Sequence, residues 1–192
     1  MIFKGLKVGF ALTGAFGAYE TTILQLSKLV ELGVDVVPIM SFNAYTLDTK
    51  FGTATEYINR IRKITGKEII HTIVESEKIG QQIQIDILVI APCTGNTIAK
   101  IANDITDTPV TMAAKSHLIN GNSIVLGIFT NNGLGANATN IGMLLNSKNI
   151  FFIPFRQNNP ITKPNSLTFD KKYIIPTIEK ALIKEQIQPL LL

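Results

Sequence analysis

The sequence is poor in the residues that carry most metal, thiol and charge chemistry. Its 192 residues include no tryptophan, one cysteine and two histidines, and only 17% of them are charged. A single cysteine, Cys93, cannot form an intramolecular disulfide, which excludes a disulfide-stabilised scaffold and favours a reducing compartment. At 46% apolar residues the chain is too hydrophobic for intrinsic disorder. We therefore expect a soluble, cytoplasmic protein that folds as a single domain over residues 1–192.

Positive charge is in slight excess, and it is dispersed. The formal net charge is +4, and no five consecutive residues are lysine or arginine. This pattern does not predict a nucleic-acid or membrane-surface footprint. No apolar run approaches the roughly 20 residues that span a bilayer.

Short apolar runs alternate with helical patterns along the chain. Because the runs are continuous, they predict strands buried on both faces, as in a parallel sheet. The predicted strands are Leu6–Leu12, Val34–Met40, Ile85–Ala91, Ile124–Phe129 and Ile150–Ile153. The predicted helices are Tyr19–Leu32, Ala54–Thr65, Asn96–Asn103, Val110–Ile119, Ala138–Asn146 and Lys172–Lys184. This order predicts an α/β fold, with a doubly wound (Rossmann-like, flavodoxin-like), mainly parallel sheet and helices on both faces.

In such folds ligands bind in the loops that follow the strands. The first of these loops contains Thr13, Gly14 and Ala15, and its glycine allows backbone N–H groups to approach a phosphate at a helix N-terminus. The glycine spacing does not match the dinucleotide fingerprint GxGxxG. A plain strand–helix turn is the alternative. Ser41 and Phe42 follow the second strand, where a serine hydroxyl can donate to a phosphate or simply form a turn.

The loop after the third predicted strand carries the most information. It reads Ala-Pro-Cys-Thr-Gly-Asn-Thr over residues 91–97. We expect Pro92 to end the strand, and Thr94, Asn96 and Thr97 to offer hydroxyl and amide groups around the tight Gly95. A helix cap needs only one such side chain, so this succession predicts a cradle for a planar, polar ligand that carries a phosphate. Cys93 is interpreted as a small buried hydrophobe.

Other catalytic signatures are absent from the sequence. His71 and His117 have no metal-ligand spacing, and neither a nucleophile elbow nor a Walker A motif is present. Glu75 and Glu77 alternate, which would allow an acid/base pair, but we interpret them as solvated residues at the end of a strand. The sequence therefore predicts no metal site and assigns no catalytic residue.

The loop motifs resemble those of a known family. Residues 91–97 resemble the APxxxNT motif of the flavoproteins that include the FMN-dependent cysteine decarboxylases, and Thr13–Ala15 looks like their first phosphate loop. A closer resemblance, to the B subunits of dipicolinate synthases of spore-forming bacteria, runs along the whole chain. The segments that carry it are YTLDTKFG (45–52), TIVESEKIG (72–80), ITDTPVTMAAK (105–115), GIFTNNGLG (127–135) and FFIPFRQNNP with the following KPNSL (within 151–167).

This resemblance implies one subunit of an enzyme of sporulation, which converts a dihydrodipicolinate-type precursor to dipicolinate. It implies FMN as cofactor, and a partner, the A subunit of dipicolinate synthase, that binds NAD(P). The residues that would hold FMN are Thr13, Gly14, Ala15, Ser41, Phe42, Thr94, Gly95, Asn96 and Thr97. The cysteine decarboxylases have an asparagine in a Pro-x-Met-Asn stretch, whereas this chain has Ala113 after Pro109-Val110-Thr111-Met112. Cysteine decarboxylation is therefore disfavoured.

A dicarboxylate substrate requires cationic partners. Lys50, Lys115 and Arg156 are the candidates, because each lies in a loop or helix near a predicted strand end. The apolar end Leu190–Leu192 and the family resemblance predict a homo-oligomer. Two alternatives remain open: a non-catalytic scaffold subunit with a vestigial flavin pocket, and a stand-alone FMN-dependent decarboxylase.

Overall fold

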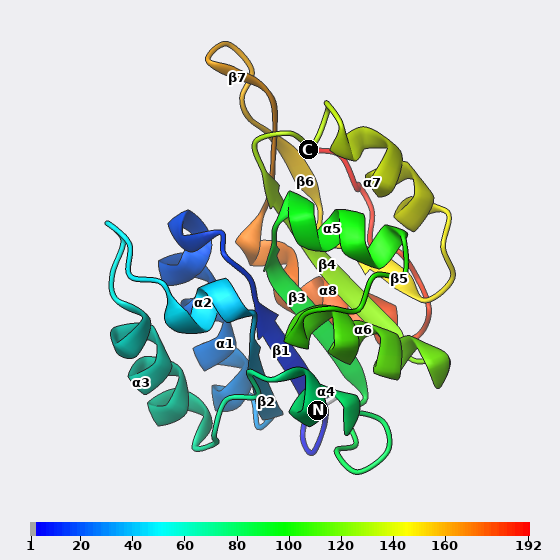
Figure 1. Cartoon of the computed structure of the whole chain (residues 1–192). Coiled ribbons are helices and arrows are strands. Elements are labelled where there is room, and N and C mark those ends of the chain that lie inside the picture. The colour runs from blue at the N-terminus through cyan, green and yellow to red at the C-terminus, as the bar shows by residue number, and fades with distance from the viewer. Residues whose placement is uncertain (1–2) are drawn as a thin grey trace.

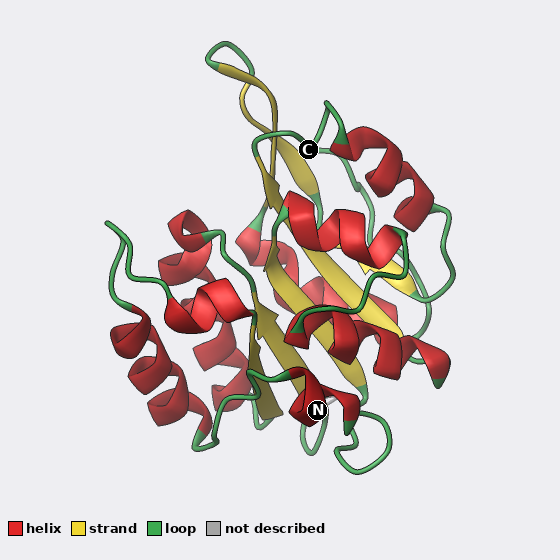
Figure 2. Cartoon of the chain, in the orientation of Figure 1, coloured by secondary structure: helices red, strands yellow, loops and turns green. Residues whose placement is uncertain are grey.

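The structure is a computed structural model, and it describes residues 3–192. Within these residues the chain forms a seven-stranded sheet in the order β2-β1-β3-β4-β7-β6, and β5 pairs with β4 (Figures 1 and 2). The strands are β1 (Lys7–Leu12), β2 (Asp35–Met40), β3 (Ile87–Cys93), β4 (Ser123–Thr130), β5 (Ile150–Phe152), β6 (Phe155–Asn159) and β7 (Lys163–Phe169). The first five are parallel, in the flavodoxin-like order 2-1-3-4-5. The predicted mainly parallel sheet is confirmed.

Helices cover both faces of this sheet, as predicted. α1 and α8 pack together on one face, and α5 and α6 lie on the other (Figure 1). The helices are α1 (Tyr19–Glu31), α2 (Phe42–Thr46), α3 (Ala54–Thr65), α4 (Ile73–Glu77), α5 (Gly95–Ala102), α6 (Pro109–Ile119), α7 (Asn137–Leu145) and α8 (Ile174–Leu182). Two 3-10 turns, η1 (Phe16–Ala18) and η2 (Lys171–Tyr173), precede α1 and α8. The two helix layers account for the burial of the strands between them.

The central strands owe their burial to their uniform apolar composition. Every residue of β3, from Ile87 to Cys93, is buried. A strand with solvent on one face would alternate apolar and polar side chains, and β3 does not. The prediction from continuous apolar runs therefore holds for the strands that position the loops.

Local signals fix the ends of α3 where the sequence predicts them. Thr53 and Glu56 form a reciprocal capping box at its start, so two backbone N–H groups gain acceptors. Gly66 ends the helix in the left-handed conformation, with φ of +66°, which costs glycine little. Both boundaries of the predicted helix Ala54–Thr65 are confirmed.

The prediction that Pro92 ends the third strand is wrong. β3 continues to Cys93, and its pairing with β4 is irregular between Ile90 and Cys93. Where the β3–β4 pairing is irregular, a proline is tolerated, because its missing N–H does not remove a regular hydrogen bond between the strands. The strand consequently ends two residues later than predicted, directly before Thr94.

Two further segments differ from the sequence interpretation. Glu75 and Glu77 lie on the helix α4 and not on a strand, and Glu75 forms a capping box with Thr72. The hairpin of β6 and β7 was not predicted, because most of its side chains are polar and exposed, and it projects from the body (Figure 1). Neither segment has the apolar periodicity on which the strand and helix predictions depend.

The C-terminal tail lies along the edge of the sheet. The side-chain amide of Gln186 pairs with the backbone of Phe152 in β5, accepting from its N–H and donating to its carbonyl, both at 2.8 Å. The backbone N–H of Leu192 donates to the carbonyl of Phe155 in β6. Leu190 packs against the apolar core. The tail thus provides hydrogen-bond partners for the backbone of Phe152 in β5 and of Phe155 in β6, which have no neighbouring strand on that side in the described part of the chain.

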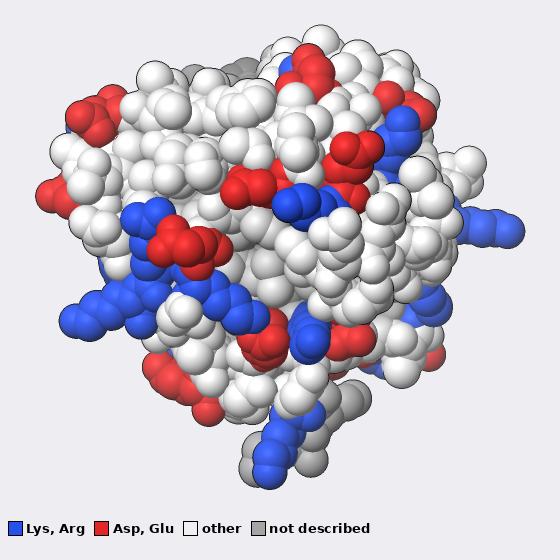
Figure 3. Space-filling model, turned by 60° about the horizontal axis from the view of Figure 1, so that its bottom comes forward, with Lys and Arg blue, Asp and Glu red and all other residues white. Residues whose placement is uncertain are grey.

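Charges are mixed at the end of the molecule that faces the reader in Figure 3. Lysine and arginine side chains lie beside aspartate and glutamate side chains over this face. Ion pairs such as Arg62 with Glu68 bring opposite charges together. In residues 3–192, no helix is both long enough and apolar enough to cross a membrane.

His117 on α6 makes the stability of the fold sensitive to acid. It is fully buried, and neither ring nitrogen has a hydrogen-bond partner within residues 3–192. Burial disfavours the charged ring and lowers the pKa of His117 to about 4. An unfolded chain, with a histidine pKa of about 6.5, binds more protons than the folded chain between these values. Stability should therefore fall as the pH drops through this window.

Urea unfolding at pH 7 and pH 4.5 measures this effect. We expect wild type to lose about 2 kcal/mol more than the variant His117→Met between these pH values. His71→Met, which replaces a partly exposed histidine, is the control and should behave as wild type does. An equal loss in wild type and His117→Met would contradict the assignment.

Candidate functional site

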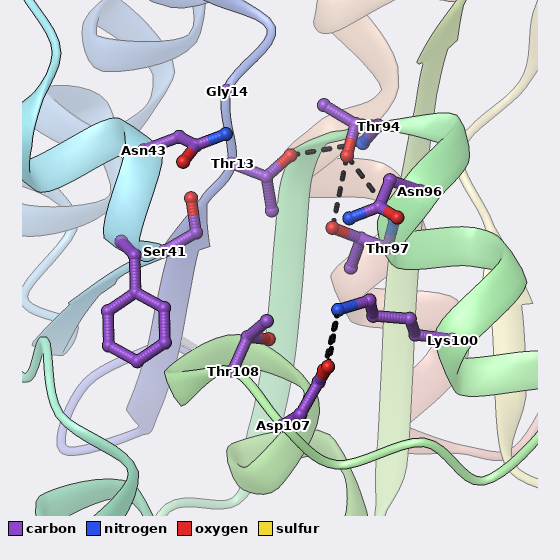
Figure 4. A pocket seen from close by; sticks show the side chains of 11 residues that line it. Thr13, Gly14, Ser41, Asn43, Thr94, Asn96, Thr97, Lys100, Asp107 and Thr108 are labelled. Carbon is purple, nitrogen blue, oxygen red and sulfur yellow. Dashed lines mark hydrogen bonds and ion pairs between the residues drawn. The ribbon is translucent and has the colours of Figure 1, made fainter.

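A cavity of about 430 Å³ opens at the carboxyl ends of β1, β2 and β3 (Figure 4). The strand order reverses between β1 and β3, and open parallel sheets bind their ligands at such a point. The cavity is lined by Thr13, Gly14, Ser41, Phe42, Asn43, Thr94, Asn96, Thr97, Lys100, Asp107 and Thr108. The topology therefore brings the ends of three strands and the starts of α2, α5 and α6 to one place.

Thr13 connects the loop after β1 to the loop after β3. Its hydroxyl donates to the carbonyl of Pro92 at 2.7 Å and accepts from the N–H of Thr94 at 3.0 Å. Its backbone N–H also donates to the carbonyl of Pro92. Because the only hydroxyl proton is already donated, this side chain is a support for the cavity wall and not a free donor to a ligand.

The start of α5 presents backbone donors to the cavity. Thr94 caps the helix, and its hydroxyl accepts from the N–H of Thr97 and pairs with the Thr97 hydroxyl at 3.0 Å. The N–H groups of Gly95 and Asn96 lie in the first turn and have no acceptor within the helix. Together with the helix dipole they favour an anion at this end.

The start of α6 and a lysine from α5 complete the opposite wall. Thr108 caps α6 and exchanges hydrogen bonds with Thr111. Lys100 Nζ lies 2.6 Å from Asp107 Oδ1, and 21% of the lysine side chain is exposed (Figure 4). A lysine held by an exposed aspartate can change partners when an anionic ligand enters. The wall thus holds one positive charge ready for a ligand.

Ser41 and its neighbours form the third side of the cavity. Ser41 Oγ accepts from the N–H of Ala44 as the cap of α2, so its hydroxyl proton stays available to a ligand. Asn43 extends an amide beside Gly14 (Figure 4), and Phe42 is 43% exposed at the cavity. Hydroxyl, amide and aromatic groups are thus available on this side.

Seven of the nine residues proposed for the cofactor line this cavity, and Ala15 and Gly95 do not. Ala15 is buried in the loop behind it. A Cβ on Gly95 would lie 2.5 Å from Asn137 Nδ2 and 2.6 Å from Thr130 Oγ1, so this glycine permits close packing of α5 against neighbouring elements. The sequence motif thus mixes residues that face the cavity with residues that shape it.

None of the three basic residues proposed for the substrate lines this cavity. Arg156 lines a second cavity of about 250 Å³, with Gly17, Phe129 and Lys171 among its neighbours, and its Nη1 lies 3.8 Å from Asp170 Oδ2. Gly14 faces the first cavity and Gly17 faces the second, so the loop between them separates the two.

The two lysines lie elsewhere. Lys115 lines a small cavity between α4 and α6 with Glu77 and Asn120. Lys50 is exposed, and its Nζ lies 5.3 Å from the centroid of the Phe51 ring. The structure therefore places only Arg156 in a cavity that shares the loop after β1 with the first one.

Lys100, Asn43, Asp107 and Thr108 were not proposed as ligand contacts from the sequence. Thr108 and Asp107 are recognisable as helix-start residues ahead of Pro109, and Lys100 lies one turn beyond Thr97 on the same helix face. That spacing is a usable signal, because residues three and four apart share a face.

Comparison with known proteins gives consistent results. Residues 3–170 match the model of the flavoprotein family. The B subunit of dipicolinate synthase from Bacillus subtilis (strain 168) is 46% identical over 188 residues, which cover 98% of this chain and 94% of that protein. The crystal structure of the corresponding B subunit from Bacillus halodurans is 47% identical, with a TM-score of 0.91 over 99% of this chain and 97% of the other. The resemblance indicated by the sequence motifs is confirmed.

A more distant similarity extends to the fold alone. The crystal structure of the FMN-dependent cysteine decarboxylase SpaF has a TM-score of 0.67 and 18% identity, and the match covers 94% of this chain and 97% of that one. At this level of identity the shared arrangement of strands and helices carries no information about the reaction.

Cys93 should be unreactive although it lies next to the cavity loop. It is fully buried at the end of β3, and burial raises the pKa of its thiol above the ordinary value. Because the thiolate is the reactive form, native protein should react slowly with a disulfide reagent at pH 8, and urea-unfolded protein should react quickly. Equal rates in the two states would contradict this environment.

Proposed function

The chain belongs to the flavoprotein family, and from this premise we propose that it binds FMN between β1 and β3 as one component of a dipicolinate synthase. The observation that carries the proposal is the cavity at the reversal of strand order, where the starts of α5 and α6 meet the loop containing Gly14. Backbone donors from separate elements converge there on a space whose two charged lining residues, Lys100 and Asp107, pair with each other. That arrangement suits a phosphate group.

The residues present fit such a cofactor. Gly14 has no side chain, and a Cβ there would lie 3.5 Å from the Cβ of Asn43, so glycine keeps this part of the cavity open. Ser41 has a hydroxyl proton to donate, and Lys100 supplies a cation opposite. These groups would hold the phosphate and the hydroxylated chain. Phe42 offers an exposed aromatic face for a flat ring.

The reaction that this assignment implies is the aromatisation of a dihydropyridine dicarboxylate. It removes two electrons and two protons, and a bound flavin supplies the acceptor for them. The chain's own residues bind and orient: Lys100 and the helix starts neutralise the nucleotide, and Thr13 keeps the loops together. A nicotinamide held by the A subunit of dipicolinate synthase is the second possible acceptor.

Apolar side chains beside the cavity support association with other chains. Phe42, Leu47 and Phe51 are 43%, 46% and 51% exposed, and they belong to the α2 segment and the loop that follows it. Exposed aromatic groups of this kind are enriched in protein interfaces. We place contacts with the A subunit or with further copies of this chain on this segment, next to the proposed cofactor.

The structure offers little support for a stand-alone cysteine decarboxylase. Ala113, at the position where the resemblance leads one to expect a catalytic amide, is fully buried within α6. Within residues 3–192, neither histidine lines the cavity. The scaffold alternative differs from the main proposal only in whether a flavin binds, so flavin binding decides between them.

Purified protein should bind FMN, and Gly14→Val should abolish that binding, because two methyl groups would fill the space beside Asn43. Absorbance near the flavin maxima and quenching of flavin fluorescence measure it. Gly142→Val is the matched control, since a Cβ there meets no atom within 4 Å. Failure of the wild-type protein to bind FMN would reject the flavin assignment and favour the scaffold alternative.

Arg156 should contribute to binding of the dicarboxylate from the second cavity. Its planar guanidinium suits a bidentate carboxylate contact, and Lys171 adds a second cation there. Arg156→Ala should weaken dipicolinate binding, measured by calorimetry, by about 1.5–3 kcal/mol, the usual value for a hydrogen bond to a charged group.

Lys115→Ala is the control for this variant, since Lys115 lines a different cavity. It should leave dipicolinate affinity and melting temperature close to those of wild type. Equal affinities for wild type and Arg156→Ala would remove Arg156 from the substrate site.

A further inference from the structure

Tyr19 is a large polar side chain buried directly behind the loop after β1. It lies at the start of α1, is fully buried, and its hydroxyl donates to the carbonyl of Thr13 at 2.9 Å. Burial raises the pKa of its hydroxyl well above the ordinary value, so the group remains protonated and acts as a donor. The ring itself packs against Phe16 and Tyr57.

The hydrogen bond from Tyr19 determines which way the next peptide unit faces. The Thr13 carbonyl accepts from Tyr19 Oη and from the N–H of Ala15. The peptide between Thr13 and Gly14 is trans, so its carbonyl and its N–H point in opposite directions. With the carbonyl fixed toward Tyr19, the Gly14 N–H points away from Tyr19. No acceptor for this N–H is found within residues 3–192.

The bonds of the Thr13 side chain do not perform the same task. The hydroxyl binds the loop after β3 through Pro92 and Thr94, which fixes the position of residue 13. The orientation of the peptide between Thr13 and Gly14 is not fixed by these side-chain bonds, because glycine at position 14 has wide backbone freedom. Without the Tyr19 hydroxyl, only the short contact from Ala15 would restrain that carbonyl.

We propose that Tyr19 is a positioning residue for the cavity, whose hydroxyl directs the Gly14 N–H at the phosphate of a bound flavin nucleotide. The proposal deepens the proposed function and rests on it for the identity of the ligand. Gly14 lines the cavity beside Asn43 and Ser41 (Figure 4), so an anion there has the Gly14 N–H and the Ser41 hydroxyl within one small region. Tyr19 contacts no ligand itself.

Tyr57 provides a matched control in the same aromatic cluster. Its ring lies edge-on to that of Tyr19, with centroids 4.8 Å apart, and it is also buried. Its hydroxyl donates to the carbonyl of Phe51 at 2.6 Å, in a loop that does not line the cavity. Tyr19→Phe and Tyr57→Phe therefore each remove one hydroxyl-to-carbonyl bond, the first buried and the second partly buried, and only the first removes one behind Gly14.

The test compares FMN with riboflavin, which lacks the phosphate. For the full chain, Tyr19→Phe should weaken FMN binding about tenfold and leave riboflavin binding within about twofold, because only a phosphate loses a charged hydrogen bond. Tyr57→Phe should change neither affinity by more than about twofold, although it too should lose stability in urea. Unchanged FMN affinity in Tyr19→Phe, or equal loss for FMN and riboflavin, would overturn the proposal.

A second measurement does not depend on flavin. In protein labelled with 15N-glycine, inorganic phosphate should shift the Gly14 amide resonance of wild type and of Tyr57→Phe, and much less that of Tyr19→Phe. If wild type binds no FMN but shows this pattern, the flavin assignment fails and the role of Tyr19 stands. If phosphate leaves the Gly14 resonance of wild type unmoved, the role of Tyr19 is rejected, whether or not Tyr19→Phe folds.

Discussion

Three hydrogen bonds between Thr13 and the pair Pro92 and Thr94 hold the loop after β1 against the loop after β3, and the cavity depends on them. In a parallel sheet these two loops follow adjacent strands, so each is anchored at one end by buried backbone. A free loop there would have to be ordered by the ligand, at a cost in conformational entropy. Because the Thr13 hydrogen bonds already order this loop in the folded protein, a ligand would bind to a preformed cavity and would not have to order the loop itself.

The other polar groups of the cavity lie together because the strands β1, β2 and β3 end at the same region. β1, β2 and β3 point their carboxyl ends at the same region, so the helices that follow begin there and direct unpaired N–H groups into it. The caps Ser41 and Thr94 each accept one N–H and leave others unpaired, whereas the start of α6 offers fewer donors because Pro109 has no N–H. A binding site for an anion is in this sense a by-product of parallel topology, and Lys100 adds the only full positive charge among the cavity-lining residues described.

The sequence was sufficient for the parts that depend on local pattern. Continuous apolar runs predicted the central strands, Thr53 and Gly66 marked both ends of α3, and Thr94, Asn96 and Thr97 were recognised as lining residues. Longer-range features could not be predicted. The hairpin of β6 and β7 has polar side chains on both faces and gains its order from pairing with β4, which no local window reveals. The pairing of Lys100 with Asp107, which lies in the loop between α5 and α6, is likewise not visible in the helix pattern, although the position of Lys100 one turn beyond Thr97 is.

Gln186 shows how much of the sheet is completed by a single side chain. Its amide supplies Phe152 of β5 with the donor and the acceptor that a neighbouring strand would otherwise provide. An open strand edge is a template for pairing with other chains, and proteins cover such edges by short, local devices. Proteolytic removal of the tail from Gln186 onward would uncover the N–H and the carbonyl of Phe152 on β5 while leaving the cavity-lining residues in place. Cleavage there would thus convert a protein protected against edge-to-edge aggregation into one that is prone to it.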